Sequence, residues 1–142
     1  MKTKLLFLFS ILPFSLMAQT QCEIELMKAM NGGLPLTLQP GIEQVISWDL
    51  TTCWFGIQNF QIYVQKPRAC PTCTQHNLPP GTPLTLLATN LTTGASTSCP
   101  SFNCWMGTVS ANKIELHLLL AATAKKPLKV EVSTTAGLGG PP

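Results

Sequence analysis

The chain has 142 residues, with nine lysines and arginines, six acidic residues and two histidines, which give a formal net charge of +3. This length suits one domain with a hydrophobic core of its own. The small charge provides no clustered basic face of the kind that nucleic-acid binding needs. We therefore expect no nucleic-acid partner.

The first 18 residues have the pattern of an export signal. Lys2 and Lys4 form a basic start, residues 5–12 are almost entirely apolar, and Ala18 offers a small side chain for cleavage. The apolar run is shorter than the roughly 20 residues of a membrane-spanning helix, so we expect no membrane insertion. Cleavage leaves seven basic against six acidic residues, a net charge of about +1. We predict a secreted, extracellular protein.

The mature chain is expected to form one domain over residues 19–136, followed by a flexible Gly/Pro tail over residues 137–142. Its first segment fits two structures. Alternation of Cys22, Ile24 and Leu26 with glutamates predicts a half-buried strand, whereas the glycines after Met30 favour a short helix with a glycine stop. We favour the strand because the later segments are β-like.

Alternation with a period of two marks most of the later chain. In residues 59–65, three apolar side chains share one face and Gln61, Tyr63 and Gln65 share the other, which predicts a sheet with one wetter side. Residues 66–83 lack periodicity and predict a long loop held by its cysteines. The seven or eight strands expected in all predict an all-β fold, an antiparallel β-sandwich. The other strands are expected at 34–38, 42–50, 83–89, 105–109, 114–120 and 128–132.

Two segments resemble neighbouring strands of fibronectin type III and related immunoglobulin-like modules. Residues 46–50, Ile-Ser-Trp-Asp-Leu, carry a tryptophan, and residues 57–64 contain an aromatic-x-aliphatic-x-Val run, as the second and third strands of those modules do. Residues 86–94 are similar to the segment that leads into their later strands, and residues 127–135 are similar to their final strand. The resemblance implies an immunoglobulin-like sandwich used as a binding or adhesive module, and it implies no catalytic residues.

Six cysteines in an exported chain predict three disulfides that staple the sandwich. Six cysteines allow fifteen pairings, so the sequence leaves the connectivity open. We expect the first two cysteines to pair, and the 70/73 pair to join the 99/104 pair, because two proline-rich loops need to be held together. The predicted disulfide cysteines are Cys22, Cys53, Cys70, Cys73, Cys99 and Cys104.

Two other uses of the cysteines compete with this prediction. The last four could supply the thiolates of a zinc site, although thiols in an oxidising compartment pair first. The Cys70-x-x-Cys73 spacing has the form of a thiol-redox motif, in which a helix N-terminus activates one thiolate. Pro79 and Pro80 would break such a helix soon after it began.

The inventory of catalytic groups is short. The mature chain holds one aspartate, Asp49, and two histidines, His76 and His117, with no Gly-x-Ser-x-Gly elbow to expose a nucleophile. The histidines do not have the spacing to Cys104 that a blue-copper site needs. We expect His117 on the polar side of a strand and His76 in a solvated loop. We predict no enzyme activity, no cofactor and no metal.

Aromatic residues directly follow two of the cysteines. If Cys53 and Cys104 point inward on extended backbone, then Trp54 and Trp105 point to the opposite face, where exposed tryptophans serve as interface anchors. The alternative is that the rings fold over the disulfides as a satellite core. With the neighbouring ring, the predicted binding residues are Trp54, Phe55 and Trp105.

These observations favour a secreted, non-enzymatic module that binds an extracellular protein or glycan through cysteine-stapled loops and exposed aromatics. Asn90-Leu91-Thr92 is an N-glycosylation acceptor if the source is a eukaryote. An alternative function is to carry a small apolar ligand between the sheets, which the leucine-rich residues 84–87 and 114–120 suggest. A zinc or thiol-redox protein is the third hypothesis.

Overall fold

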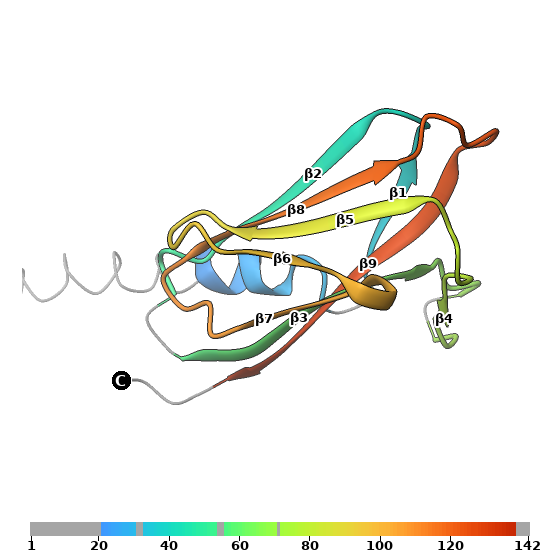
Figure 1. The fold of residues 1–142 in the computed structure, drawn as a ribbon. Coiled ribbons are helices and arrows are strands. Elements are labelled where there is room, and N and C mark those ends of the chain that lie inside the picture. Colours follow the sequence, from blue (N-terminus) through green and yellow to red (C-terminus); the bar gives the residue numbers. More distant parts are fainter. Residues whose placement is uncertain (1–20, 31–32, 54–55, 71, 139–142) are drawn as a thin grey trace, which may run out of the picture.

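The computed structural model describes residues 21–30, 33–53, 56–70 and 72–138. Within these ranges the chain folds into two antiparallel β-sheets packed face to face (Figure 1). The predicted β-sandwich is therefore confirmed. The predicted export signal over residues 1–18 lies outside the described residues.

Sheet A has the order β1-β9-β3, and the far side of β3 pairs with both β7 and the two-residue β4. Sheet B has the order β2-β8-β5-β6. A 3-10 turn, η1 (Pro100–Phe102), joins the two sheets between β6 and β7. The strands are β1 (Leu34–Leu38), β2 (Glu43–Asp49), β3 (Ile57–Lys66), β4 (His76–Asn77), β5 (Leu84–Asn90), β6 (Ser96–Ser98), β7 (Asn103–Gly107), β8 (Lys113–Leu120) and β9 (Leu128–Leu138).

The chain passes repeatedly between the two sheets. The last strand, β9, pairs with β1 and β3, while β8 pairs with β2 and β5. An immunoglobulin-like sandwich instead places its first, second, fourth and fifth strands in one sheet. The order found here is that of a double-sheet jelly roll. The immunoglobulin-like strand order implied by the resemblance is therefore not confirmed.

Apolar side chains from alternate positions of both sheets fill the space between them. In β8, Ile114 and Leu116 are buried, whereas Glu115 lies on the outer face. At the centre, Trp48 of sheet B meets Phe60 of sheet A edge to face, with ring centroids 6.0 Å apart. The core thus joins the two sheets through their largest side chains.

Residues 21–27 form a helix, so the predicted strand at the start of the mature chain is wrong. Cys22, Leu26 and Ala29 are buried at the spacing of one helical face, whereas Ile24 is 58% exposed. A strand that buried Cys22 and Leu26 would also have placed the charged Lys28 on the buried face, which is costly. The helical arrangement keeps this lysine at the surface.

The segment over residues 21–30 bridges one side of the sandwich (Figure 1, blue). The Lys28 ammonium donates to the carbonyl of Ser47 in β2, an edge strand of sheet B, at 2.7 Å. In sheet A, the backbone N–H of Thr134 in β9 donates to the carbonyl of Ala29 at 3.0 Å. The segment therefore satisfies backbone groups of both sheets outside their own ladders.

The C-terminal strand is longer than the sequence predicted. β9 continues through residue 138, two residues into the range predicted as a flexible tail. Residues 139–142 lie outside the described residues. Within the described ranges, no helix has the length and apolar character needed to cross a membrane.

Candidate functional site

All six cysteines form disulfides, as predicted. The bonds join Cys22 to Cys53, Cys70 to Cys73 and Cys99 to Cys104, with Cα separations of 5.1, 5.1 and 4.4 Å. Such bonds form and persist in an oxidising compartment. Because none of the six is free, no thiolate remains to hold the zinc ion of the competing hypothesis.

The pairing of the first two cysteines is confirmed, but the predicted link between the two later pairs is wrong. Cys70 and Cys73 lie in the loop before β4, whereas Cys99 and Cys104 flank η1, where the chain crosses from sheet B to sheet A. The N–H of Cys73 donates to the carbonyl of Cys70 at 3.0 Å, which closes a turn within the motif. Each pair therefore staples its own turn.

The Cys70–Cys73 bond is the pairing that a thiol-redox motif would use. Residues 74–75 are not helical and lead directly into β4, in agreement with the effect predicted for the prolines. Without a helix N-terminus, the dipole that would stabilise a thiolate is missing from this motif. The thiol-redox hypothesis therefore lacks the helix dipole that would activate a thiolate.

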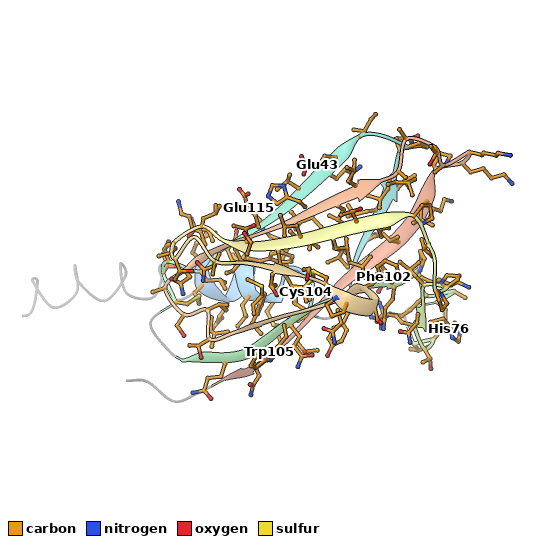
Figure 2. The ribbon with its side chains drawn as sticks, in the orientation of Figure 1. Glu43, His76, Phe102, Cys104, Trp105 and Glu115 are labelled. Carbon is orange, nitrogen blue, oxygen red and sulfur yellow. A yellow bond between two sulfur atoms is a disulfide. The ribbon has the colours of Figure 1, made fainter. Side chains whose placement is uncertain are left out.

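Trp105 lies on the outer face of sheet A (Figure 2). Its neighbour Cys104 is buried between the sheets, and alternation along β7 turns the indole to the opposite side, where it is 62% exposed. The alternative of a satellite core is therefore wrong for this ring. The other two predicted binding residues, Trp54 and Phe55, lie outside the described residues.

Cross-strand pairing places three rows of side chains on the face that Trp105 shares. Gln61, Tyr63 and Gln65 form the central column, so the wetter face predicted for this strand is confirmed. The Tyr63 hydroxyl donates to the Gln61 side-chain oxygen, and the Gln65 amide donates to Asn77 at 3.0 Å. We call the nine residues the sheet A platform: Trp105, Gln61 and Thr135; Asn103, Tyr63 and Ser133; Asn77, Gln65 and Glu131.

The acidic member of the platform, Glu131, is paired and covered. Its carboxylate accepts hydrogen bonds from the side chain and backbone of Arg68, both at 3.1 Å, and from the Gln75 amide at 2.7 Å. Gly33 packs so closely that a Cβ there would overlap the carboxylate, and its φ of +70° also favours glycine. The exposed groups of these nine side chains are therefore amides, hydroxyls and two aromatic rings.

A shallow hollow of about 300 Å³ opens on the platform. Tyr63, Ser133 and Thr135 line it together with Arg68 and Gln75 from the loop before β4. Gln75 also donates to the Ser133 hydroxyl at 2.9 Å, which joins the loop to β9. The volume lies at the lower end of the range of ligand pockets, roughly 300–1,000 Å³.

A second hollow, of about 330 Å³, lies where β6 meets β7 and includes Ser96, Trp105 and Asn90 in its lining. Asn90 is 7% exposed, and its side-chain oxygen accepts the N–H groups of Thr92 and Thr93 at 3.0 and 3.2 Å. The side chain therefore holds the turn between β5 and β6. Glycosylation of Asn90 stays a prediction, and the burial of this side chain works against it.

The outer face of sheet B carries a titratable cluster. His117 lies between Glu43 and Glu115, with nitrogen–oxygen distances of 2.9 and 3.0 Å; both glutamates are labelled in Figure 2. Desolvation lowers the pKa of His117, but hydrogen bonds to the two carboxylates outweigh this effect and raise the pKa overall. Because both ring nitrogens can donate only in the imidazolium form, the cluster favours the charged ring.

Asp49 and His76 lie apart from this cluster. Asp49 lies opposite Lys113 in the strand register at the other end of β2, and hydrogen bonds from Thr51 lower the pKa of its carboxyl group. His76 is exposed in β4, at the side of sheet A (Figure 2). The structure thus does not bring the aspartate and the two histidines together. Nor do three or more His, Cys, Asp or Glu side chains gather as metal ligands anywhere in the described ranges.

The leucines proposed to line a cavity for an apolar ligand belong to the common core. Leu84 and Leu86 of β5, and Leu116 and Leu118 of β8, are buried in one cluster with Trp48. A ligand at this position would have to displace core side chains, which pack at the density of an organic crystal. The carrier hypothesis stays a prediction.

Sequence reasoning placed the binding surface in the cysteine-stapled loops and did not assign it to the face of a sheet. The signal was present in β3, whose outward positions Gln61, Tyr63 and Gln65 share one side. The contribution of Arg68 could not be found in this way, because it meets Glu131 from 63 residues away in the sequence.

The sheet A platform is the candidate site because it combines an exposed aromatic ring, neutral hydrogen-bonding groups and a hollow on one face. A jelly roll by itself does not define a function, because one fold supports many unrelated ones. Comparison with models of protein families, with curated proteins and with solved structures gives no match for the chain.

Proposed function

We propose that the protein is a secreted, non-enzymatic binding module that captures an extracellular protein or glycan on the sheet A platform. The observation that carries this proposal is the exposed indole of Trp105 beside a row of neutral polar side chains. Covering this ring on binding removes a large apolar surface from water. The contact surface is thus a sheet face rather than the cysteine-stapled loops.

The platform is held in place before a partner arrives. Its side chains stand on paired strands, and the Tyr63–Gln61 and Gln65–Asn77 hydrogen bonds restrict four of them. The Cys99–Cys104 disulfide staples the turn that leads into β7 next to Trp105. A preordered surface loses less conformational entropy on binding, which supports a role in recognition.

The chemistry of the platform favours binding over catalysis. Its exposed groups are amides, hydroxyls and aromatic rings, which act as hydrogen-bond donors and acceptors and as apolar contacts. Its carboxylate, on Glu131, is engaged by Arg68 and Gln75. The export pattern of residues 1–18 and the three disulfides support an extracellular setting.

The proposal is tested by adding the labelled protein to intact cells and extracellular material of its source. Trp105→Ala should reduce binding to background without lowering the melting temperature, since exposed substitutions change stability by roughly 0.5 kcal/mol or less. Leu87→Ala is the matched control, because Leu87 is 42% exposed on the outer face of sheet B. Binding that survives Trp105→Ala would contradict the proposal, and loss of binding in Leu87→Ala would place the contact surface on sheet B instead.

A further inference from the structure

We propose that the ligand of the sheet A platform is an uncharged glycan chain that runs from the hollow beside Tyr63 to the indole of Trp105. This inference rests on the binding function proposed above and selects one of its two classes of partner. It is drawn from the rings, the hydrogen-bonding groups and the charge of the platform.

The two rings provide stacking surfaces for sugars. Trp105 on β7 pairs with Gln61 of β3, and Tyr63 is two residues further along β3 on the same face. The two aromatic residues are therefore diagonal neighbours, with Cα atoms roughly 7–8 Å apart. The face of an aromatic ring carries partial negative charge, which attracts the weakly positive C–H groups on one side of a pyranose ring.

The polar groups of the platform match sugar hydroxyls. A hydroxyl donates one hydrogen bond and accepts others, and a glutamine side chain offers both an acceptor oxygen and two N–H donors. Gln61 lies between the two rings, while Gln65 and Gln75 lie at the hollow with the Ser133 hydroxyl. Each sugar ring on this path would meet an amide beside an aromatic ring.

The charge of the platform separates glycans from other ligands. Anionic polymers and phosphates need free arginine or lysine groups. The Arg68 guanidinium is paired with Glu131, and the exposed Lys129 lies one row beyond the platform on β9. The fully buried core of a protein–protein interface is about 65% apolar, whereas two rings stand here among amides and hydroxyls. A neutral, hydroxyl-rich polymer is the partner that these groups fit.

The hollow and Trp105 together set a minimum length for the ligand. Thr135 lines the hollow and belongs to the same cross-strand row as Gln61 and Trp105. One sugar unit in the hollow would leave the indole uncovered. We therefore expect an oligosaccharide to bind more tightly than its monosaccharide.

The test is affinity electrophoresis and calorimetry of the full chain with soluble neutral polysaccharides, namely β-glucan, xylan and galactomannan, and with the anionic polymers heparin and alginate. We expect binding to at least one neutral polysaccharide, and added salt should not weaken it. Trp105→Ala and Gln61→Ala should each weaken this binding by about tenfold or more, and Trp105→Phe should weaken it less. Leu87→Ala on sheet B should bind as the unchanged protein does.

The outcomes separate this inference from the function on which it rests. If no neutral polysaccharide binds, while protease-sensitive material of the source is still captured through Trp105, the partner is a protein and only the glycan inference fails. Binding confined to the anionic polymers and abolished by salt also overturns it. Neutral polysaccharide binding that both platform variants leave unchanged overturns the placement of the ligand. If Trp105→Ala weakens neither the binding to material of the source nor the binding to a neutral polysaccharide, both proposals are overturned.

Discussion

The two outer faces of the sandwich follow the same alternating pattern but differ in how they hold charge. On sheet A, Glu131 is covered by Arg68 and Gln75, and the side chains of the platform that are left in water are neutral; the exposed Lys129 lies beyond the platform on the same strand. On sheet B, Glu43 and His117 form an ion pair that remains partly in water. A neutral face keeps its hydrogen-bonding groups over a wide range of pH, whereas the charge on the other face changes near neutrality.

This difference shows that the fold does not distinguish the two faces, since both stand on strands of the same core. What distinguishes them is the loop before β4, which carries Arg68 and Gln75 over the end of sheet A. The turns of sheet B place no comparable cover on His117, whose side chain keeps 29% exposure. The covering of Glu131 by this loop thus makes the outer face of sheet A differ from the solvated outer face of sheet B.

Breaking the shared core should damage both faces together, and we expect the largest effect there. Trp48→Ala removes a fully buried ring that packs on Phe60 and should lower the free energy of unfolding by about 3–5 kcal/mol. Chemical denaturation measures this loss. Trp48→Phe should cost less, because it keeps an aromatic ring in the core and breaks no hydrogen bond: the indole N–H of Trp48 has no partner among the described residues. Equal losses in the two variants would contradict this packing.

Removing one disulfide at a time should show that the two bonds stabilise the fold to different degrees. Replacing Cys22 and Cys53 by alanine opens a long loop and should cost about 4 kcal/mol, whereas replacing Cys70 and Cys73 opens a short one and should cost about 2 kcal/mol. Thermal unfolding of the two double variants gives the comparison. A larger loss from the second pair would show that the loop before β4 holds more than its own turn.

A change at Glu131 should act on sheet A alone. Glu131→Ala removes the acceptor of the Arg68 guanidinium and one of the two acceptors of the Gln75 amide, and it should cost about 2–3 kcal/mol. Tryptic cleavage at Arg68 should become faster as the loop is released. Glu131→Gln keeps an acceptor and serves as the milder control. Unchanged cleavage in Glu131→Ala would mean that other contacts hold the loop.

The smallest expected effect is a pH dependence on sheet B. Because the folded pKa of His117 is raised above its ordinary value of 6.5, the stabilisation from its carboxylate partners is fully present below pH 6.5. It is lost as the pH rises through the folded pKa. Melting temperatures between about pH 6 and about pH 8 should fall slightly, and His117→Gln should remove this slope. Ligand binding by sheet A should stay constant over the same range, and a parallel fall would contradict the separation of the faces.

Local patterns predicted the strands and their faces, because alternation along one strand depends on near neighbours alone. The outward Gln61 and Tyr63 were found in this way. Pairing across the sheet could not be read from the sequence, since β1 meets β9 at the far end of the chain. The alternation that resembled immunoglobulin-like modules is shared by any half-buried sandwich, so it could not identify the strand order. For residues 21–27, a helix keeps Lys28 at the surface, whereas a strand would have buried it.

The bonds from residues 21–30 to Ser47 and Thr134 have a consequence for how molecules of this protein meet one another. Backbone groups left open along a strand invite pairing with the strand of another molecule, which is the first step of fibril growth. Because this short segment occupies one such group on each sheet, we expect it to make the strand edges less open to pairing with another molecule. A shortened protein that begins at β1 and carries Cys53→Ala, so that no thiol is left unpaired, should therefore aggregate during refolding even where its core still forms.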